Sequence, residues 1–184
     1  DTIVILDTSI IRKPNPINIK KETESFNAFA IDIGIPIFSE PGININAYSQ
    51  YAALLGKTID PINEKEIDAG YGLIPLGISA SFGIAKMNFE FRMVPSGNFE
   101  FGYFDRSYEV ERATFQSING NQGKIVTKAR KLGTYGKQNG FYSSMNLNLG
   151  SLIDARLAFQ NLNGQQYDPV GNKFEIETNK SFTA

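Results

Sequence analysis

Hydrophobic and polar residues alternate with a period of two along several stretches of this chain. The clearest stretch is 26–38, FNAFAIDIGIPIF, where large apolar residues from Phe29 to Ile37 alternate with small or polar ones. Successive side chains of a β-strand point to opposite faces, so this pattern predicts a strand with one apolar face. A short turn at 39–42, which contains Pro and Gly, leads to a second alternating stretch at 43–55. Together they predict a β-hairpin.

Two further hairpins repeat this pattern. In the first, residues 67–82 and 87–93 flank a tight link at 83–85, and the alternation changes phase near Ile74 and Pro75. Proline cannot donate to a strand ladder, so we expect a β-bulge at that point. In the second, 140–161, Gly150 and Ser151 predict a two-residue turn.

The connections alternate in length. Tight turns are expected at 39–42, 83–85 and 150–151, and long polar loops at 56–66, at about 100–139 and at 162–172. A last strand is expected to begin at 173–178, and the β-branched stretch 2–12 is also expected to be extended. In an up-and-down sheet every short turn then falls at one end. The sequence therefore predicts an all-β fold, an antiparallel up-and-down β-barrel of roughly eight or more strands, as one domain over residues 1–184.

Composition removes several classes of function. The chain has no cysteine and no histidine, which excludes thiol nucleophiles and thiolate metal sites and removes the commonest general base. The formal net charge is −1, so no overall positive field favours nucleic acid. No apolar run is long enough for a transmembrane helix. We therefore expect no enzyme, no catalytic residue, no cofactor, no metal site and no nucleic-acid partner.

The apolar face of the predicted barrel allows two interpretations. If it meets lipid, the chain is an outer-membrane barrel that acts as a passive pore or as a structural component of the membrane. If it forms a core, the chain is a soluble β-barrel or β-sandwich, secreted or periplasmic, that binds an apolar ligand or a partner protein. The strand lengths of about 9–13 residues and the asymmetric connections favour the membrane interpretation. The partners are then membrane lipid and small solutes in the lumen.

Three stretches resemble an uncharacterised family of bacterial outer-membrane, porin-like β-barrel proteins. They are FAIDIGIPIF at 29–38, MNFEFR at 87–92 and GYFDRSYEVER at 102–112. The resemblance implies a location in the outer membrane rather than a reaction. Ala184 is not the terminal aromatic residue usual in such chains, and Asp1 begins within strand-like sequence. Both departures are compatible with the chain being part of a larger barrel.

The polar face supplies the candidate lumen-lining residues. They are Asp32, Asn44, Asn46, Gln50, Lys86, Glu90, Arg92, Asp154 and Arg156. Their charges would either screen solutes in an open lumen or form ion pairs that fill a closed one. Glu90 and Asp154 could in principle form a carboxylate pair, but the cations beside them would keep both ionised.

The segment 94–112 carries the densest group of aromatic and charged residues. Its candidate recognition residues, expected at the outer mouth of the barrel, are Tyr103, Phe104, Asp105, Arg106, Tyr108 and Arg112. Phe and Tyr also favour the headgroup level of a membrane, so an interfacial aromatic girdle is the alternative. A basic stretch at 124–131 is expected to lie in a solvated loop or to contact acidic groups.

Overall fold

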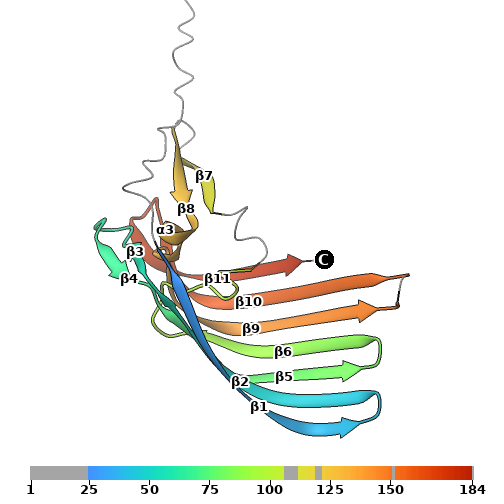
Figure 1. The fold of residues 1–184 in the computed structure, drawn as a ribbon. Coiled ribbons are helices and arrows are strands. Elements are labelled where there is room, and N and C mark those ends of the chain that lie inside the picture. The colour runs from blue at the N-terminus through green and yellow to red at the C-terminus, as the bar shows by residue number, and fades with distance from the viewer. Residues whose placement is uncertain (1–24, 106–111, 119–121, 151, 184) are drawn as a thin grey trace, which may run out of the picture.

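The computed structural model describes residues 25–105, 112–118, 122–150 and 152–183, and these form an all-β fold around one seven-stranded antiparallel sheet. The strand order is β1-β2-β5-β6-β9-β10-β11, and the sheet is visibly curved (Figure 1). Its strands are β1 (Asn27–Glu40), β2 (Ile43–Leu55), β5 (Tyr71–Phe82), β6 (Ala85–Val94), β9 (Tyr135–Asn148), β10 (Asp154–Asp168) and β11 (Lys173–Thr183). Within the described residues the sheet stays open, with β1 and β11 at its two edges.

Three short connections lie together at one end of the sheet, as Figure 1 shows. Two are the predicted tight turns, and Gly42 (φ 84°) and Gly83 (φ 54°) occupy the left-handed region that glycine tolerates best. The third is wider than predicted. β9 ends at Asn148, β10 begins at Asp154, and the amide of Leu149 donates to the carbonyl of Ile153 at 2.8 Å. A turn does lie at the predicted position, because the amide of Leu152 donates to the carbonyl of Leu149 at 3.2 Å, but the prediction that only two residues join the strands was wrong.

The opposite end carries the longer connections and the small secondary elements. β3 (Lys57–Ile59) pairs with β4 (Glu66–Asp68), and β7 (Ala113–Ile118) pairs with β8 (Gln122–Thr127), which leads into the short helix α3 (Lys128–Leu132). The long polar loop expected to reach residue 139 is thus largely ordered structure, and β9 already begins at Tyr135.

The prediction of a polar loop at 162–172 was also wrong. β10 continues to Asp168, and only four residues separate it from β11. The carboxylate of Asp168 accepts hydrogen bonds from the amides of Val170 and Gly171, which closes this turn. The strand expected at 2–12 lies outside the described residues.

The β-bulge expected near Pro75 is confirmed. The pairing of β5 with β6 shifts its register between Leu73 and Leu76, and the pairing of β2 with β5 shifts its register between Tyr48 and Gln50. The hydroxyl of Ser49 donates to the carbonyl of Ile74 at 3.0 Å, which satisfies an acceptor that the irregular ladder leaves available.

A small hydrophobic core lies at the end of the sheet with the long connections. It contains Leu54, Val94, Phe99, Tyr103, Leu132 and Tyr135. Thr58 joins α3 to β3, because its fully buried hydroxyl donates to the carbonyl of Ala129 at 2.7 Å and accepts from the amide of Gly133 at 3.1 Å. The rest of the sheet has no second layer of strands among the described residues. No helix in the described part of the chain has the length and apolar character to cross a membrane.

Candidate functional site

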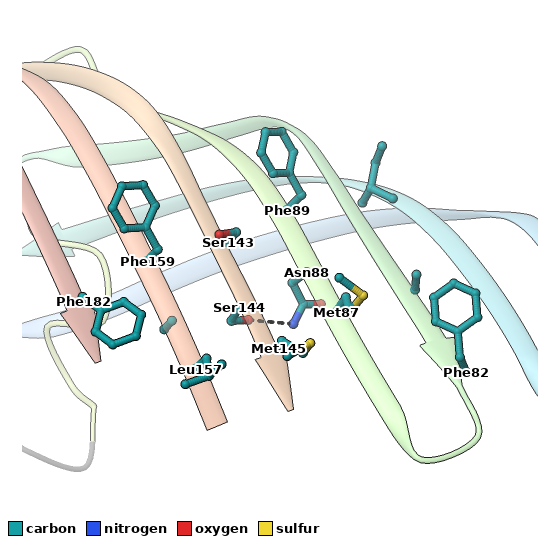
Figure 2. A pocket seen from close by; sticks show the side chains of 13 residues that line it. Phe82, Met87, Asn88, Phe89, Ser143, Ser144, Met145, Leu157, Phe159 and Phe182 are labelled. Atoms are coloured by element: carbon teal, nitrogen blue, oxygen red, sulfur yellow. Dashed lines mark hydrogen bonds between the residues drawn. The ribbon is translucent and has the colours of Figure 1, made fainter. Parts of the chain in front are cut away.

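The apolar face of the sheet is exposed. Ile33 and Ile35 of β1 keep 67% and 66% of their surface accessible. The pairing continues this face across the sheet: Ile78 opposes Phe89, Met87 opposes Met145, and Met145 opposes Leu157. Figure 2 shows part of it, a shallow apolar hollow of about 420 Å³ bordered by Phe82, Phe89, Phe159 and Phe182. A soluble sheet would bury such a face as its core.

The apolar face forms a continuous band of limited height. Along β2 it runs from Ile43 to Leu55, which is still 57% exposed, about 41 Å at roughly 3.4 Å per residue, or about 31 Å for strands tilted by roughly 40°. That is taller than the apolar band of about 25 Å on membrane barrels and close to the roughly 30 Å hydrocarbon core of a bilayer. Between the registers of Ile45 and Tyr51, no described residue of β1, β2, β5, β6, β9 or β10 on this face is charged. On the edge strand β11, Lys180 opposes Asn161 and lies on this face.

The opposite, polar face carries a hydrogen-bonded network that begins on β2. The hydroxyl of Tyr48 donates to Glu90 Oε1 on β6 at 2.6 Å, although β5 lies between the two strands. The register places Gly77 of β5 between them. A Cβ on Gly77 would lie 2.4 Å from Tyr48 Cζ, so the tyrosine ring crosses β5 where a side chain is missing.

The network continues through Arg92 of β6. Its Nε lies 2.7 Å from Glu90 Oε2, and its Nη1 donates to Gln160 Oε1 of β10 at 2.7 Å. The guanidinium carbon also lies 3.7 Å from the ring centroid of Tyr142 and 4.8 Å from that of Phe101. Glu90 is only 9% exposed, so its charge is balanced by an adjacent cation, as a buried carboxylate requires.

A segment between β6 and β7 covers part of this polar face. Phe101, Gly102 and Asp105 border a cavity of about 320 Å³ whose other walls come from β6, β9, β10 and β11. Part of the polar face is therefore covered while the apolar face is exposed, the reverse of a soluble sheet.

The predicted lumen-lining residues share the polar face but do not form one site. Asp32 opposes Gln50, while Asn44 opposes Ser81 and Asn46 opposes Ser79. Lys86 and Arg156 both pair with Asn146, near the short turns, and both are exposed. Within the described residues, Glu90 and Arg92 are the two of them that form an ion pair with each other.

The carboxylate pair considered from the sequence is not formed. Glu90 opposes Tyr142, which opposes Gln160, whereas Asp154 lies six residues from Gln160 at the start of β10. At roughly 3.4 Å per residue this separates the two carboxylates by about 20 Å.

The expected recognition surface at 103–112 is partly wrong. Tyr103 is only 3% exposed, because its ring packs against Phe26 and lies 5.4 Å from the ammonium of Lys128. Phe104, Asp105 and Arg112 are exposed, and Arg106 and Tyr108 lie outside the described residues. Lys128 is itself buried, so this part of the basic stretch is not a solvated loop.

Five residues of this network were not predicted from the sequence: Tyr48, Gly77, Phe101, Tyr142 and Gln160. The position of Gly77 opposite Glu90 could have been predicted from the sequence, because a two-residue turn after Phe82 sets this register. The contacts of Arg92 were not available, because the register of β6 on β9 follows a long connection and Phe101 lies within that connection.

The arrangement provides a charge-balanced cluster on the polar face and a band of exposed apolar side chains on the opposite face. In the described part of the chain, no group of three or more acidic, His or Cys side chains gathers as metal ligands would. The chain matches no protein-family model, no curated protein and no solved structure.

Proposed function

We propose that this chain is a membrane-spanning β-barrel, or part of one, in a bacterial outer membrane. Its apolar face meets lipid and its polar face lines the barrel interior. It acts as a passive pore or as a structural component of the membrane. The single observation that carries the proposal is the reversed burial, in which large aliphatic residues are exposed while Glu90 is covered.

Free-energy arguments favour lipid as the medium around the exposed face. Contiguous apolar patches larger than a few hundred Å² are rare on soluble monomers, and this one extends over six neighbouring strands. Burying apolar surface gains about 25 cal/mol per Å², and a bilayer supplies that burial without a second protein layer.

The barrel itself requires closure of the open sheet. Seven strands in up-and-down order leave β1 and β11 running in the same direction. An odd number of additional strands between these two edges would close the sheet with antiparallel ladders throughout. The membrane proposal requires this closure, because an open sheet edge cannot persist in hydrocarbon.

The proposal is tested by placing an arginine on either face of β1. Ile33→Arg puts a charge on the apolar face and should reduce stability in lipid by about 2–4 kcal/mol at mid-depth. Asp32→Arg, the matched control, puts the same side chain on the polar face at the neighbouring position and should still insert. The measurement is the fraction of refolded protein that co-sediments with phosphatidylcholine vesicles and resists protease.

A soluble protein would give the opposite result. Ile33 is 67% exposed, so in water Ile33→Arg should leave folding unchanged. Tolerance of both variants, or a monodisperse wild-type protein in detergent-free buffer, would refute the membrane proposal.

A further inference from the structure

We infer that the apolar hollow on the exposed face of the sheet is a binding site for one phospholipid acyl chain. The chain enters from the end with the short turns, lies along β9 and ends at the ring of Phe141. This inference rests on the proposed function and adds to it, because it distinguishes one bound chain from the lipid that surrounds the rest of the apolar face.

A single small residue creates the floor of the hollow. Ser143 of β9 pairs with Phe89 of β6 on one side and with Phe159 of β10 on the other. Phe159 pairs in turn with Phe182 of β11. Ser143 is thus a small side chain in a row that contains three phenylalanines, and Figure 2 shows Phe89 and Phe159 on either side of it. The hollow exists because position 143 is small.

Flexible apolar side chains form much of the remaining lining. The next row toward the short turns contains Ala80, Met87, Met145 and Leu157, and all four line the hollow. Methionine has three rotatable bonds and a polarisable sulfur, so it adapts to the contour of a hydrocarbon. Two polar members of the lining, Asn88 and Ser144, hydrogen-bond to each other at 3.2 Å. None of the described lining residues is charged, so the site suits a neutral hydrocarbon chain.

The length of the hollow is about the depth of one bilayer leaflet. On β5 its lining extends from Phe82, next to a short turn, to Ile78, about 14 Å at roughly 3.4 Å per residue. Half of a hydrocarbon core of about 30 Å is about 15 Å. Beyond Ser143, the ring of Phe141 stacks on that of Phe89 at a centroid distance of 5.6 Å. The hollow therefore ends where an acyl chain of one leaflet ends.

An acyl chain is also the occupant that the surrounding medium supplies. The hollow has a volume of about 420 Å³. An apolar cavity stays dry, because its lining offers too few hydrogen-bond partners to water. If the hollow stayed empty, its lining would lose dispersion contacts on the open side. A hydrocarbon chain restores these contacts without bringing a polar group to the lining.

The hollow does not depend on the open edges of the sheet. Its floor lies on β9, and β10 lies between β9 and the edge strand β11. Of the described lining residues, only Phe182 belongs to an edge strand. Strands added beyond β11 would therefore extend that side of the hollow and leave its floor uncovered.

The experiment is photo-crosslinking in vesicles of phosphatidylcholine that carries a diazirine near the end of one acyl chain. Ile35 lies in the same row of pairs as Ser143 and is 66% exposed, whereas Leu157 in the hollow is 38% exposed. Lipid that only surrounds the protein should label Ile35 more strongly. A chain held in the hollow should label Met145 and Leu157 several-fold more strongly than Ile35, as measured by mass spectrometry of peptides.

Filling the hollow should abolish this preference. Ser143→Phe occupies the floor and should reduce the labelling of Met145 and Leu157 to that of Ile35 or below. Ser143→Leu fills the floor in part and should have an intermediate effect, which keeps the test informative if Ser143→Phe impairs insertion. Ala53→Phe is the matched control, because Ala53 pairs with Phe29 on the apolar face and lies outside the hollow. It should retain the preference.

Insertion is measured separately by co-sedimentation with vesicles and protease resistance. If wild-type protein inserts and its labelling follows exposure, the inference is wrong while the proposed function stands. The same conclusion follows if Ser143→Phe inserts and keeps the preference. Absence of label from the hollow while Ile35 is labelled would mean that protein, such as a second copy of the chain, covers the hollow, which also refutes the inference. If wild-type protein does not insert at all, both are wrong.

Discussion

Replacing Gly77 by alanine tests the network on the polar face. Local strand propensity predicts that this change raises the free energy of unfolding, whereas tertiary packing predicts that it lowers it. Glycine inside a strand is less favourable than alanine by roughly 0.5–1 kcal/mol, so Gly77→Ala should stabilise β5 if only propensity mattered. The structure predicts a loss of stability, since the new Cβ would lie 2.4 Å from Tyr48 Cζ and 2.5 Å from Tyr48 Cε2.

The magnitude follows from the displacement of the tyrosine. Carbon atoms in contact are ordinarily about 3.5–4.0 Å apart, so the ring must move by about 1 Å or more. The hydroxyl donates to Glu90 at 2.6 Å, and a shift of that size breaks or badly bends this hydrogen bond. A hydrogen bond to a charged group contributes about 1.5–3 kcal/mol, so Gly77→Ala should cost about 2 kcal/mol in total.

The assay is urea unfolding in detergent micelles, with the free energy of unfolding obtained by linear extrapolation. Tyr48→Phe is the matched control, because it removes the hydroxyl and leaves the ring in place. In a Tyr48→Ala background the obstacle disappears, and Gly77→Ala should then stabilise by about 0.5–1 kcal/mol. If Gly77→Ala has the same effect in both backgrounds, Tyr48 does not cross β5 at this glycine, and the reasoning is refuted.

Two further predictions concern the end of the sheet with the long connections. Thr58→Val should lower the free energy of unfolding by about 1–3 kcal/mol, because it leaves the carbonyl of Ala129 and the amide of Gly133 buried without their partner. Thr58→Ser keeps the hydroxyl and should retain most of the stability. Equal losses in both variants, measured by urea unfolding, would contradict this role. The hydrogen bond from Lys57 to Asp68 raises the pKa of Lys57 above its ordinary 10.5. The pair therefore stabilises the folded protein at pH values below the pKa that Lys57 has in the unfolded chain, and this stabilisation is lost as the pH rises through the pKa of the folded protein. Asp68→Asn should lower this pKa in an NMR titration of the lysine Nζ, and an unchanged value would show that the pair is not formed in solution.

The three hairpins were predictable because each depends on local physics. Alternation assigns each side chain to a face, and a two-residue turn fixes the register of the strands it joins. The turns predicted at 39–42 and 83–85 lie at these places, but each is only two residues long, because Glu40 pairs with Ile43 and Phe82 pairs with Ala85. The bulge was also predictable, since a proline within the alternation at position 75 requires an irregular ladder.

The long connections were not predictable from pattern. Residues 113–139 are polar and glycine-containing, so they suggested a loop, yet they contain β7, β8, α3 and the first residues of β9. The end of β10 was missed for the same reason, because polar residues such as Gln165 and Gln166 extend the strand through pairing with β11 rather than through burial of an apolar face.

The sequence by itself determined that the chain is all-β, that its strands have one apolar and one polar face, and that Glu90 and Arg92 share the polar one. These properties depend on residues two positions apart, and the period of the strand is sufficient to place them. Only the tertiary structure decided which face is covered and which side chains meet across strands. Tyr48 reaches Glu90 over a glycine on the strand between them, and Phe101 reaches Arg92 from a connecting segment. Both contacts depend on registers separated by long connections, whose geometry no local pattern specifies.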